Sequence, residues 1–140
     1  MTIDDYLDAA TRRPWIYGGG EGGFRGHDCT LFTANWALSF GRGDPALHRG
    51  RYDSRHEAEA IVSEAGGFVP LIGAALINIG WRSVMQAEEG DIGVVSFAAG
   101  RGRMLQLPAV RRGRNWIVAD PRRLVALPGD LFCLMAWRAQ

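Results

Sequence analysis

The hydrophobic pattern of the chain changes near residue 80, and this change constrains the fold more than any other feature. Before residue 80, apolar residues recur at helical spacing; after it, they form short runs split by glycine, proline and arginine. Because the links between the later runs are too short for helical crossovers, neighbouring strands must pair antiparallel. The pattern predicts an α+β fold, with N-terminal helices packed on a C-terminal antiparallel sheet. At 140 residues, the chain fits one domain, 1–140, with one core.

Capping residues mark where the helices begin. Thr2 with Asp5 forms a capping box for a helix over 2–12, and Ser54 with Glu57 forms another for a helix that ends at 66–67. Asp28 is a good N-cap for a helix from Cys29 to about residue 40. A further short helix is expected over 71–79. The runs expected as strands are 91–97, 104–110, 115–119 and 131–137.

A glycine-rich segment precedes Cys29. Six glycines between Gly18 and Gly26 predict a loop with positive φ angles and no regular element. Cys29 then lies in the first turn of a helix, where free N–H groups and the helix dipole favour a thiolate and lower the thiol pKa. The loop would leave the sulfur open to a substrate. From this spacing alone, Cys29 is either a nucleophile or a small core residue.

Two motifs resemble a known family. The run Pro14-Trp15-Ile16-Tyr17-Gly18-Gly19, a glycine-rich loop and then Asp28-Cys29-Thr30-Leu31-Phe32 resembles the NlpC-type cell-wall cysteine peptidases, which are papain-like. The later Glu89-Gly90-Asp91-Ile92 is similar to the Gly-Asp turn that leads into the first strand of that family's sheet. The resemblance extends from Pro14 to about Trp137 and implies a papain-like, NlpC-type domain.

The resemblance also implies roles for individual residues. Cys29 would attack a peptide carbonyl in the peptidoglycan stem, with its own N–H helping to hold the oxyanion. Asp28 would cap the helix, and Tyr17 would line the site. The cleft would include Trp15, Gly18, Gly19 and, on the second strand, Gln106.

The histidine that the family uses as a base is missing from its expected strand. That strand reads Gly102-Arg103-Met104-Leu105-Gln106-Leu107, and no histidine follows His56. Gln106 cannot replace an imidazole, because an amide neither accepts nor delivers a proton near neutral pH. His27 could fold back toward the sulfur, and His48 or His56 could supply a substitute. Asn115 or Asp120 could fill the third, orienting place.

Two functions follow from the resemblance, and a third, a cytosolic domain that binds a small ligand in the glycine-rich cleft, does not depend on it. Residues 43–45 and 49–52, Gly-Asp-Pro and Arg-Gly-Arg-Tyr, are similar to a divergent branch of the family in phages and prophages. The first function is cysteine-dependent peptidoglycan hydrolysis with an incomplete triad. The alternative is an inactive structural component of a phage tail tip or hub that keeps the peptidase fold, which exposed aromatic surface at Trp81 or Trp137 would favour. The expected partners are peptidoglycan or phage tail proteins, and the expected location is the virion, or the host cytoplasm before assembly.

Composition excludes other classes. All sixteen basic residues are arginines and the net charge is +1, which leaves no lysine for a Schiff base and little drive for nucleic-acid binding. The arginines crowding the last third are interpreted mainly as solvated, with an anion site as the alternative. No run predicts membrane insertion or a signal peptide. His27 and Cys29 could be two zinc ligands, but no second Cys/His pair lies at a suitable spacing, so we expect no metal. The glycines of 18–23 do not open a helix between two parallel strands, as a dinucleotide-binding loop does, so we expect no cofactor.

Overall fold

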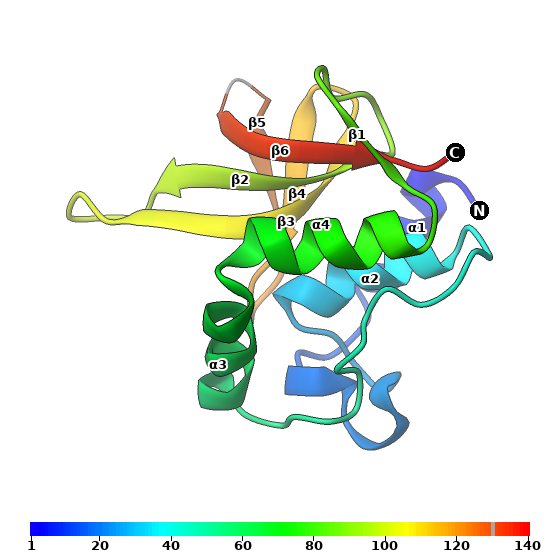
Figure 1. Ribbon diagram of the computed structural model, residues 1–140. Coiled ribbons are helices and arrows are strands. Elements are labelled where there is room, and N and C mark those ends of the chain that lie inside the picture. Colours follow the sequence, from blue (N-terminus) through cyan, green and yellow to red (C-terminus); the bar gives the residue numbers. More distant parts are fainter. Residues whose placement is uncertain (130) are drawn as a thin grey trace.

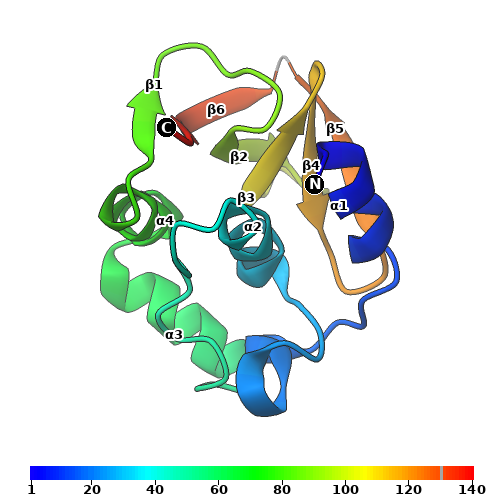
Figure 2. The same ribbon diagram turned by 90° about the vertical axis from the view of Figure 1, so that its right-hand side faces the viewer.

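The computed structural model describes residues 1–129 and 131–140, and it confirms the predicted α+β arrangement. The α-helices are α1 (Ile3–Ala10), α2 (Cys29–Leu38), α3 (Arg55–Ala65) and α4 (Phe68–Asn78). The strands are β1 (Arg82–Val84), β2 (Ile92–Ala98), β3 (Met104–Arg112), β4 (Asn115–Ala119), β5 (Leu124–Pro128) and β6 (Phe132–Arg138). They form an antiparallel sheet in the order β1-β6-β2-β3-β4-β5. The helices lie on one side of this sheet, and α3 lies farther from it than α2 and α4 (Figures 1 and 2).

The predicted N-cap residues Thr2, Asp28 and Ser54 are present, but the Ser54–Glu57 box is incomplete, because the Glu57 carboxylate accepts from the Asp53 N–H and the Ser54 hydroxyl instead of the Ser54 N–H. Asp5 N–H donates to Thr2 Oγ1 over 3.1 Å, and Thr2 N–H donates to Asp5 Oδ2 over 3.3 Å.

The helix predicted over 71–79 begins three residues earlier, at Phe68. The reason is that Pro70 lies in the first turn of α4, where a missing N–H removes no intrahelical hydrogen bond.

The sheet contains two strands that the sequence pattern did not predict. β1 is three residues long and mostly exposed, and β5 follows two arginines and ends at Pro128. Both are edge strands, which lack the continuous apolar run of a buried strand. The Gly90-Asp91 turn therefore leads into the second strand of the sheet. The expected loop at residues 18–26 also contains two one-turn 3₁₀ helices, η1 (Tyr17–Gly19) and η2 (Glu21–Gly23).

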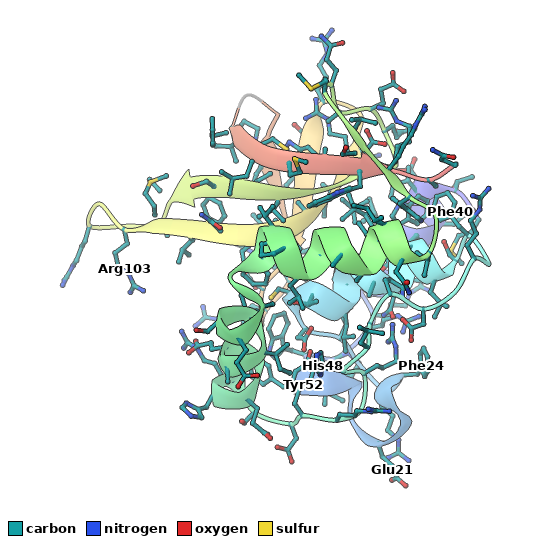
Figure 3. The ribbon with its side chains drawn as sticks, in the orientation of Figure 1. Glu21, Phe24, Phe40, His48, Tyr52 and Arg103 are labelled. Carbon is teal, nitrogen blue, oxygen red and sulfur yellow. The ribbon has the colours of Figure 1, made fainter. Side chains whose placement is uncertain are left out.

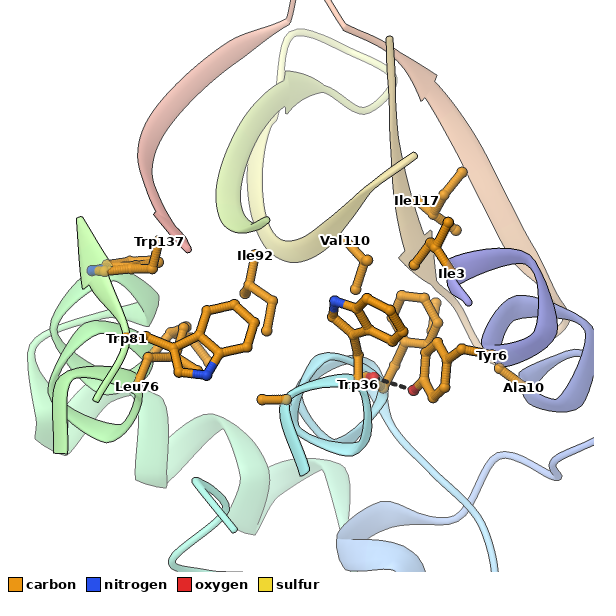
Figure 4. Packing of buried hydrophobic residues seen from close by; sticks show 14 of the residues in the cluster. Ile3, Tyr6, Ala10, Trp36, Leu76, Trp81, Ile92, Val110, Ile117 and Trp137 are labelled. Atoms are coloured by element: carbon orange, nitrogen blue, oxygen red, sulfur yellow. Dashed lines mark hydrogen bonds between the residues drawn. The ribbon is translucent and has the colours of Figure 1, made fainter. Parts of the chain in front are cut away.

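Apolar side chains are buried on both faces of the sheet. The larger cluster lies between the sheet and helices α1, α2 and α4 and is rich in aromatic rings (Figure 4). Trp81 and Trp137 are buried in it, so the exposed aromatic surface considered for an assembly role is not at these positions. A smaller cluster on the other face is built around Trp116.

No described helix is by itself long and apolar enough to cross a membrane. Helices α3 and α4 pass such a length and composition test as a pair, with a bend of 78° between them.

Candidate functional site

The carboxylate of Asp28 joins three segments of the chain. Its Oδ1 accepts hydrogen bonds from the N–H groups of Thr30 and Leu31, at 3.1 and 2.8 Å, which caps α2. Its Oδ2 accepts from the Gly18 N–H at 3.0 Å and from the Tyr52 hydroxyl. Asp28 is 2% exposed, so these bonds replace lost hydration of the buried charge. The predicted capping role is present, and Asp28 also anchors both the glycine-rich segment and the link over 42–53.

Gly18 brings the glycine-rich segment against this link. Its φ is +72°, and a Cβ at this position would lie 1.9 Å from the carbonyl oxygen of Tyr52. The Gly50 N–H donates to the Gly18 carbonyl over 2.8 Å. A residue with a side chain would have to break this contact, so the glycine is required by the approach of the two backbones as well as by the turn.

Arg49 fixes the other end of the link. Its guanidinium forms two hydrogen bonds to Asp44, at 2.7 and 3.1 Å, and donates to the Gly23 carbonyl over 3.1 Å. It also lies 4.3 Å from the ring centre of Phe24. Partial burial acts to raise the pKa of Asp44, but the hydrogen bonds from Arg49 and Ala46 outweigh it and lower the pKa. The sequence motifs at 43–45 and 49–52 therefore fasten the link onto the glycine-rich segment.

A cavity of about 630 Å³ opens beside the N-terminus of α2. Its walls come from α2, α3, α4, the link, β3 and the end of β4. Most of the lining side chains are apolar, and among them are Leu47, Ile61, Val62, Phe68, Leu71 and Leu105. A cavity of this size and lining is typical of sites that hold an apolar ligand or peptide side chains.

Five of the predicted site residues line this cavity. They are Trp15, Tyr17, Asp28, Cys29 and Gln106. Gly18 and Gly19 are buried in the packing next to it and are not part of its walls. The structure thus brings the predicted nucleophile together with Trp15, Tyr17 and Gln106 of the predicted cleft. The two glycines are buried outside the cavity wall.

Cys29 lies in the first turn of α2, as predicted, but its pKa is shifted in the unexpected direction. Burial raises the pKa of the thiol to about 12, and the Asp28 carboxylate adds to the effect. The Thr30 hydroxyl oxygen, 3.9 Å from the sulfur, lowers the pKa but does not offset these two effects. The expected lowering is wrong because burial disfavours the thiolate and Asp28 places a negative charge next to the sulfur, and together these outweigh the N–H groups of Cys29 and Thr30, which lower the pKa.

His27 is held away from the cavity wall. It is buried, and its ring packs edge-on against Trp15 and Phe32, with centroid distances of 6.4 and 5.8 Å. Its Nδ1 has no hydrogen-bond partner among the described residues. Burial lowers the pKa of His27, and the nearby Arg13 acts in the same direction. His27 is therefore a neutral packing residue near pH 7.

Of the remaining candidate histidines and orienting residues, some line the cavity and others do not. His48 lines the cavity and His56 on α3 does not. Figure 3 labels His48 on the link, near Tyr52. Of the two candidate orienting residues, Asp120 lines the cavity and Asn115 does not. The Asp120 carboxylate accepts the N–H groups of Arg122 and Arg123, at 2.7 and 2.9 Å, and so caps its own turn.

Gln106 lies on the helix side of β3. In β3, Val110 belongs to the cluster under the helices, and side chains alternate between faces along a strand. Gln106 is four residues from Val110 and shares its face. It pairs with Ser96, two residues beyond Val94 of the same cluster. The cavity that contains Cys29 therefore has an amide on its β3 wall.

Comparison with known proteins gives one match. The family model described as "Domain of unknown function (DUF6950)" matches residues 1–139. The chain belongs to this family. No curated protein and no solved structure matches it.

Sequence reasoning on this DUF6950 chain missed Tyr52 and the contribution of α3. Tyr52 binds a carboxylate 24 positions away, and no local pattern encodes such a contact. The apolar face of α3 was visible at helical spacing, but that pattern does not tell a core-facing helix from one that faces a cavity. In the described part of the chain, no three His, Cys, Asp or Glu side chains gather as a metal-binding group.

Proposed function

We propose that this domain is a binding module with an NlpC-type, papain-like fold, which holds a segment of a partner protein in the cavity beside Cys29 and does not hydrolyse it. The observation that carries this proposal is the identity of Gln106. The family that the motifs resemble uses a histidine on this strand as the base, and the amide of Gln106, which lines the same cavity as Cys29, cannot serve as one.

The order of the elements supports the NlpC-type assignment. Cys29 begins a helix that packs on an antiparallel sheet, and Gly90-Asp91 leads into β2 of that sheet. The carbonyl of Gly90 accepts the indole N–H of Trp36 on α2 over 2.8 Å. The side chain of Asp91 is paired with Arg138 at 2.8 Å. The two motifs of the resemblance are therefore joined directly, since the helix of the first contacts the turn of the second.

The surroundings of Cys29 support a role other than catalysis. A nucleophilic cysteine at a helix start uses the free N–H groups to stabilise a thiolate and then the oxyanion. Two of those groups, on Thr30 and Leu31, donate to Asp28. The sulfur therefore lacks a base on β3, and burial and the Asp28 charge oppose formation of the thiolate.

The cavity itself supports binding. Its apolar walls would bury aliphatic or aromatic side chains of a partner, and each square ångström removed from water contributes about 25 cal/mol. The resemblance to a phage and prophage branch favours a phage tail protein as that partner, in a tail tip or hub.

Hydrolysis remains the second candidate, because His48 lines the same cavity as Cys29. In that scheme His48 would take the thiol proton and later protonate the leaving amine. Peptidoglycan would then be the substrate. The two candidates differ in whether soluble muropeptides are released.

The test is a digest of purified peptidoglycan by the unaltered chain and by the variants Cys29→Ala and His48→Asn, with chromatography of the soluble products. We expect the unaltered chain to release no more than buffer does. Release that disappears in both variants would contradict the binding proposal and establish the hydrolase. The variant His56→Asn, altered on the exposed surface of α3, is the matched control for His48.

A further inference from the structure

Strand β3 has a long stretch of free edge at the cavity. It pairs with β2 from Met104 to Val110, but β4 pairs with it only from Val110 to Arg112. Beyond that point β4 continues with β5 as its partner. Within the described chain, no strand pairs with the outer edge of β3 between Met104 and Ala109.

The hydrogen-bond alternation of an antiparallel pair shows which peptide groups point to that edge. Arg111 N–H donates to Asp91 on the β2 side over 2.8 Å, and the Arg103 carbonyl accepts from Ala99 over 2.7 Å. Odd-numbered residues of β3 therefore bond toward β2, and even-numbered residues bond away from it. Gln106 directs its N–H and C=O outward, and Pro108, which has no N–H, occupies the next outward position.

This edge lies in the wall of the cavity. Leu105, Gln106 and Leu107 line it, together with Ala119 and Pro121 at the end of β4. Gln106 is exposed. A strand added here would place every second side chain between β3 and the apolar face of α3.

The sheet end around this edge is basic. Arg101 and Arg103 lie at the tip of the β2–β3 hairpin, where Figure 3 labels Arg103, and Arg122 and Arg123 lie in the β4–β5 turn. None of these four forms an ion pair with a described carboxylate. Asp120 is the single acidic residue in 99–129. This distribution favours an occupant with acidic ends.

We propose that an extended segment of a partner protein, with apolar residues at alternate positions and acidic residues at its ends, adds as a strand to the free edge of β3. The proposal rests on the binding function proposed above and names the chemistry of the partner. The Gln106 peptide group supplies backbone pairing, the cavity takes the alternate apolar side chains, and the four arginines take the acidic ends.

The test uses the full chain and a fluorescein-labelled peptide, Asp-Asp-Val-Ser-Leu-Ser-Val-Asp-Asp, titrated by fluorescence anisotropy. Substitution Gln106→Pro removes the outward N–H without touching a bond to β2, and we expect about a tenfold loss of affinity. Gln106→Ala keeps the outward N–H and removes only the side chain, so it is the control that distinguishes loss of the side chain from loss of the N–H. The same peptide with alternate backbone nitrogens methylated tests the pairing without altering the protein, and we expect a similar loss.

Charge is tested in the same assay. We expect the double variant Arg103→Glu, Arg123→Glu to weaken binding about tenfold at low salt and less at high salt. Arg12→Glu on α1, which removes an exposed ion pair with Asp8, is the matched control. A peptide with lysine in place of aspartate should bind more weakly than the acidic one. Equal affinity for methylated and unmethylated peptides, or for acidic and basic ones, would overturn the proposal.

A separate probe distinguishes failure of this proposal from failure of the binding function. The dye 1-anilinonaphthalene-8-sulfonate should fluoresce with the unaltered chain and lose that signal in Ile61→Asp, which places a charge on the cavity wall. Dye binding without peptide binding would overturn the strand addition and leave the binding function intact. Absence of both, with Cys29-dependent release of muropeptides, would overturn both.

Discussion

The layer between the sheet and helices α1, α2 and α4 differs from the layer beyond α2 in what holds it together. The first is a continuous apolar cluster that includes Phe32 and Trp137, which are 0% and 1% exposed. In the second, α3 contains no fully buried residue. There the glycine-rich segment and the link are joined through the carboxylate of Asp28 and the guanidinium of Arg49.

This difference shows how a small domain can keep a cavity open. Apolar packing tends to close every void, because each void loses dispersion contacts. Directed hydrogen bonds to a buried carboxylate fix the segments around the cavity at set distances without filling it. Stability should therefore depend on side-chain volume in the first layer and on backbone geometry in the second.

The largest effect is expected at Gly18. Substitution Gly18→Ala combines a positive φ with a Cβ 1.9 Å from a backbone oxygen, so we expect a loss of about 3 to 4 kcal/mol in the free energy of unfolding. Gly22→Ala is the matched control, since its φ is +77° but nothing lies within 4 Å of the added atom. It should lose about 1 kcal/mol. Urea unfolding measures both, and equal losses would contradict the proposed contact between segment and link.

The next largest effect is expected from replacing isoleucine by alanine, and its size should differ between the two layers. Ile117→Ala removes a side chain buried in the core and should cost about 3 kcal/mol. Ile61→Ala on α3 removes a half-buried side chain that faces the cavity, and alanine favours a helix, so we expect less than about 1 kcal/mol. If Ile61→Ala costs as much as Ile117→Ala, the two layers are packed alike and the comparison fails.

A smaller effect is expected from the titration of His27. Because burial lowers its pKa in the folded chain, the unfolded chain binds a proton first as the pH falls below about 6.5. The free energy of unfolding should therefore decrease from about pH 7 to pH 5. His27→Gln should reduce this decrease, whereas His56→Gln, on the surface, should leave it unchanged. The same pH dependence in all three chains would show that His27 does not carry it.

Local patterns predicted most of the secondary structure because the physical causes are local. The Thr2–Asp5 box and the Asp28 cap act within one helical turn, and 115–119 coincides with β4. The two missed strands, β1 and β5, are edge strands defined by pairing with distant residues. Their sequences carry little of the alternation that a half-buried strand shows.

The candidate site was predicted in part. Asp28, Cys29, Tyr17, Trp15 and Gln106 share one cavity, as the resemblance implied. The direction of the Cys29 pKa shift was wrong, because the position of a cysteine in a helix does not reveal how deeply the folded chain buries its sulfur. Tyr52 was not predicted, because its contact with Asp28 exists only in the folded chain.

The central claim is that Cys29 is not an activated nucleophile, and the most direct measurement is its alkylation rate against pH. Iodoacetamide labelling of the folded chain, followed by peptide mass spectrometry, reports Cys29 and the partly buried Cys133 together, with the urea-unfolded chain as reference. Because burial and Asp28 raise the Cys29 pKa to about 12, its rate should stay below that of the unfolded chain and still be rising at about pH 10. A rate that reaches its plateau below about pH 8 would contradict the account and identify Cys29 as an activated thiolate.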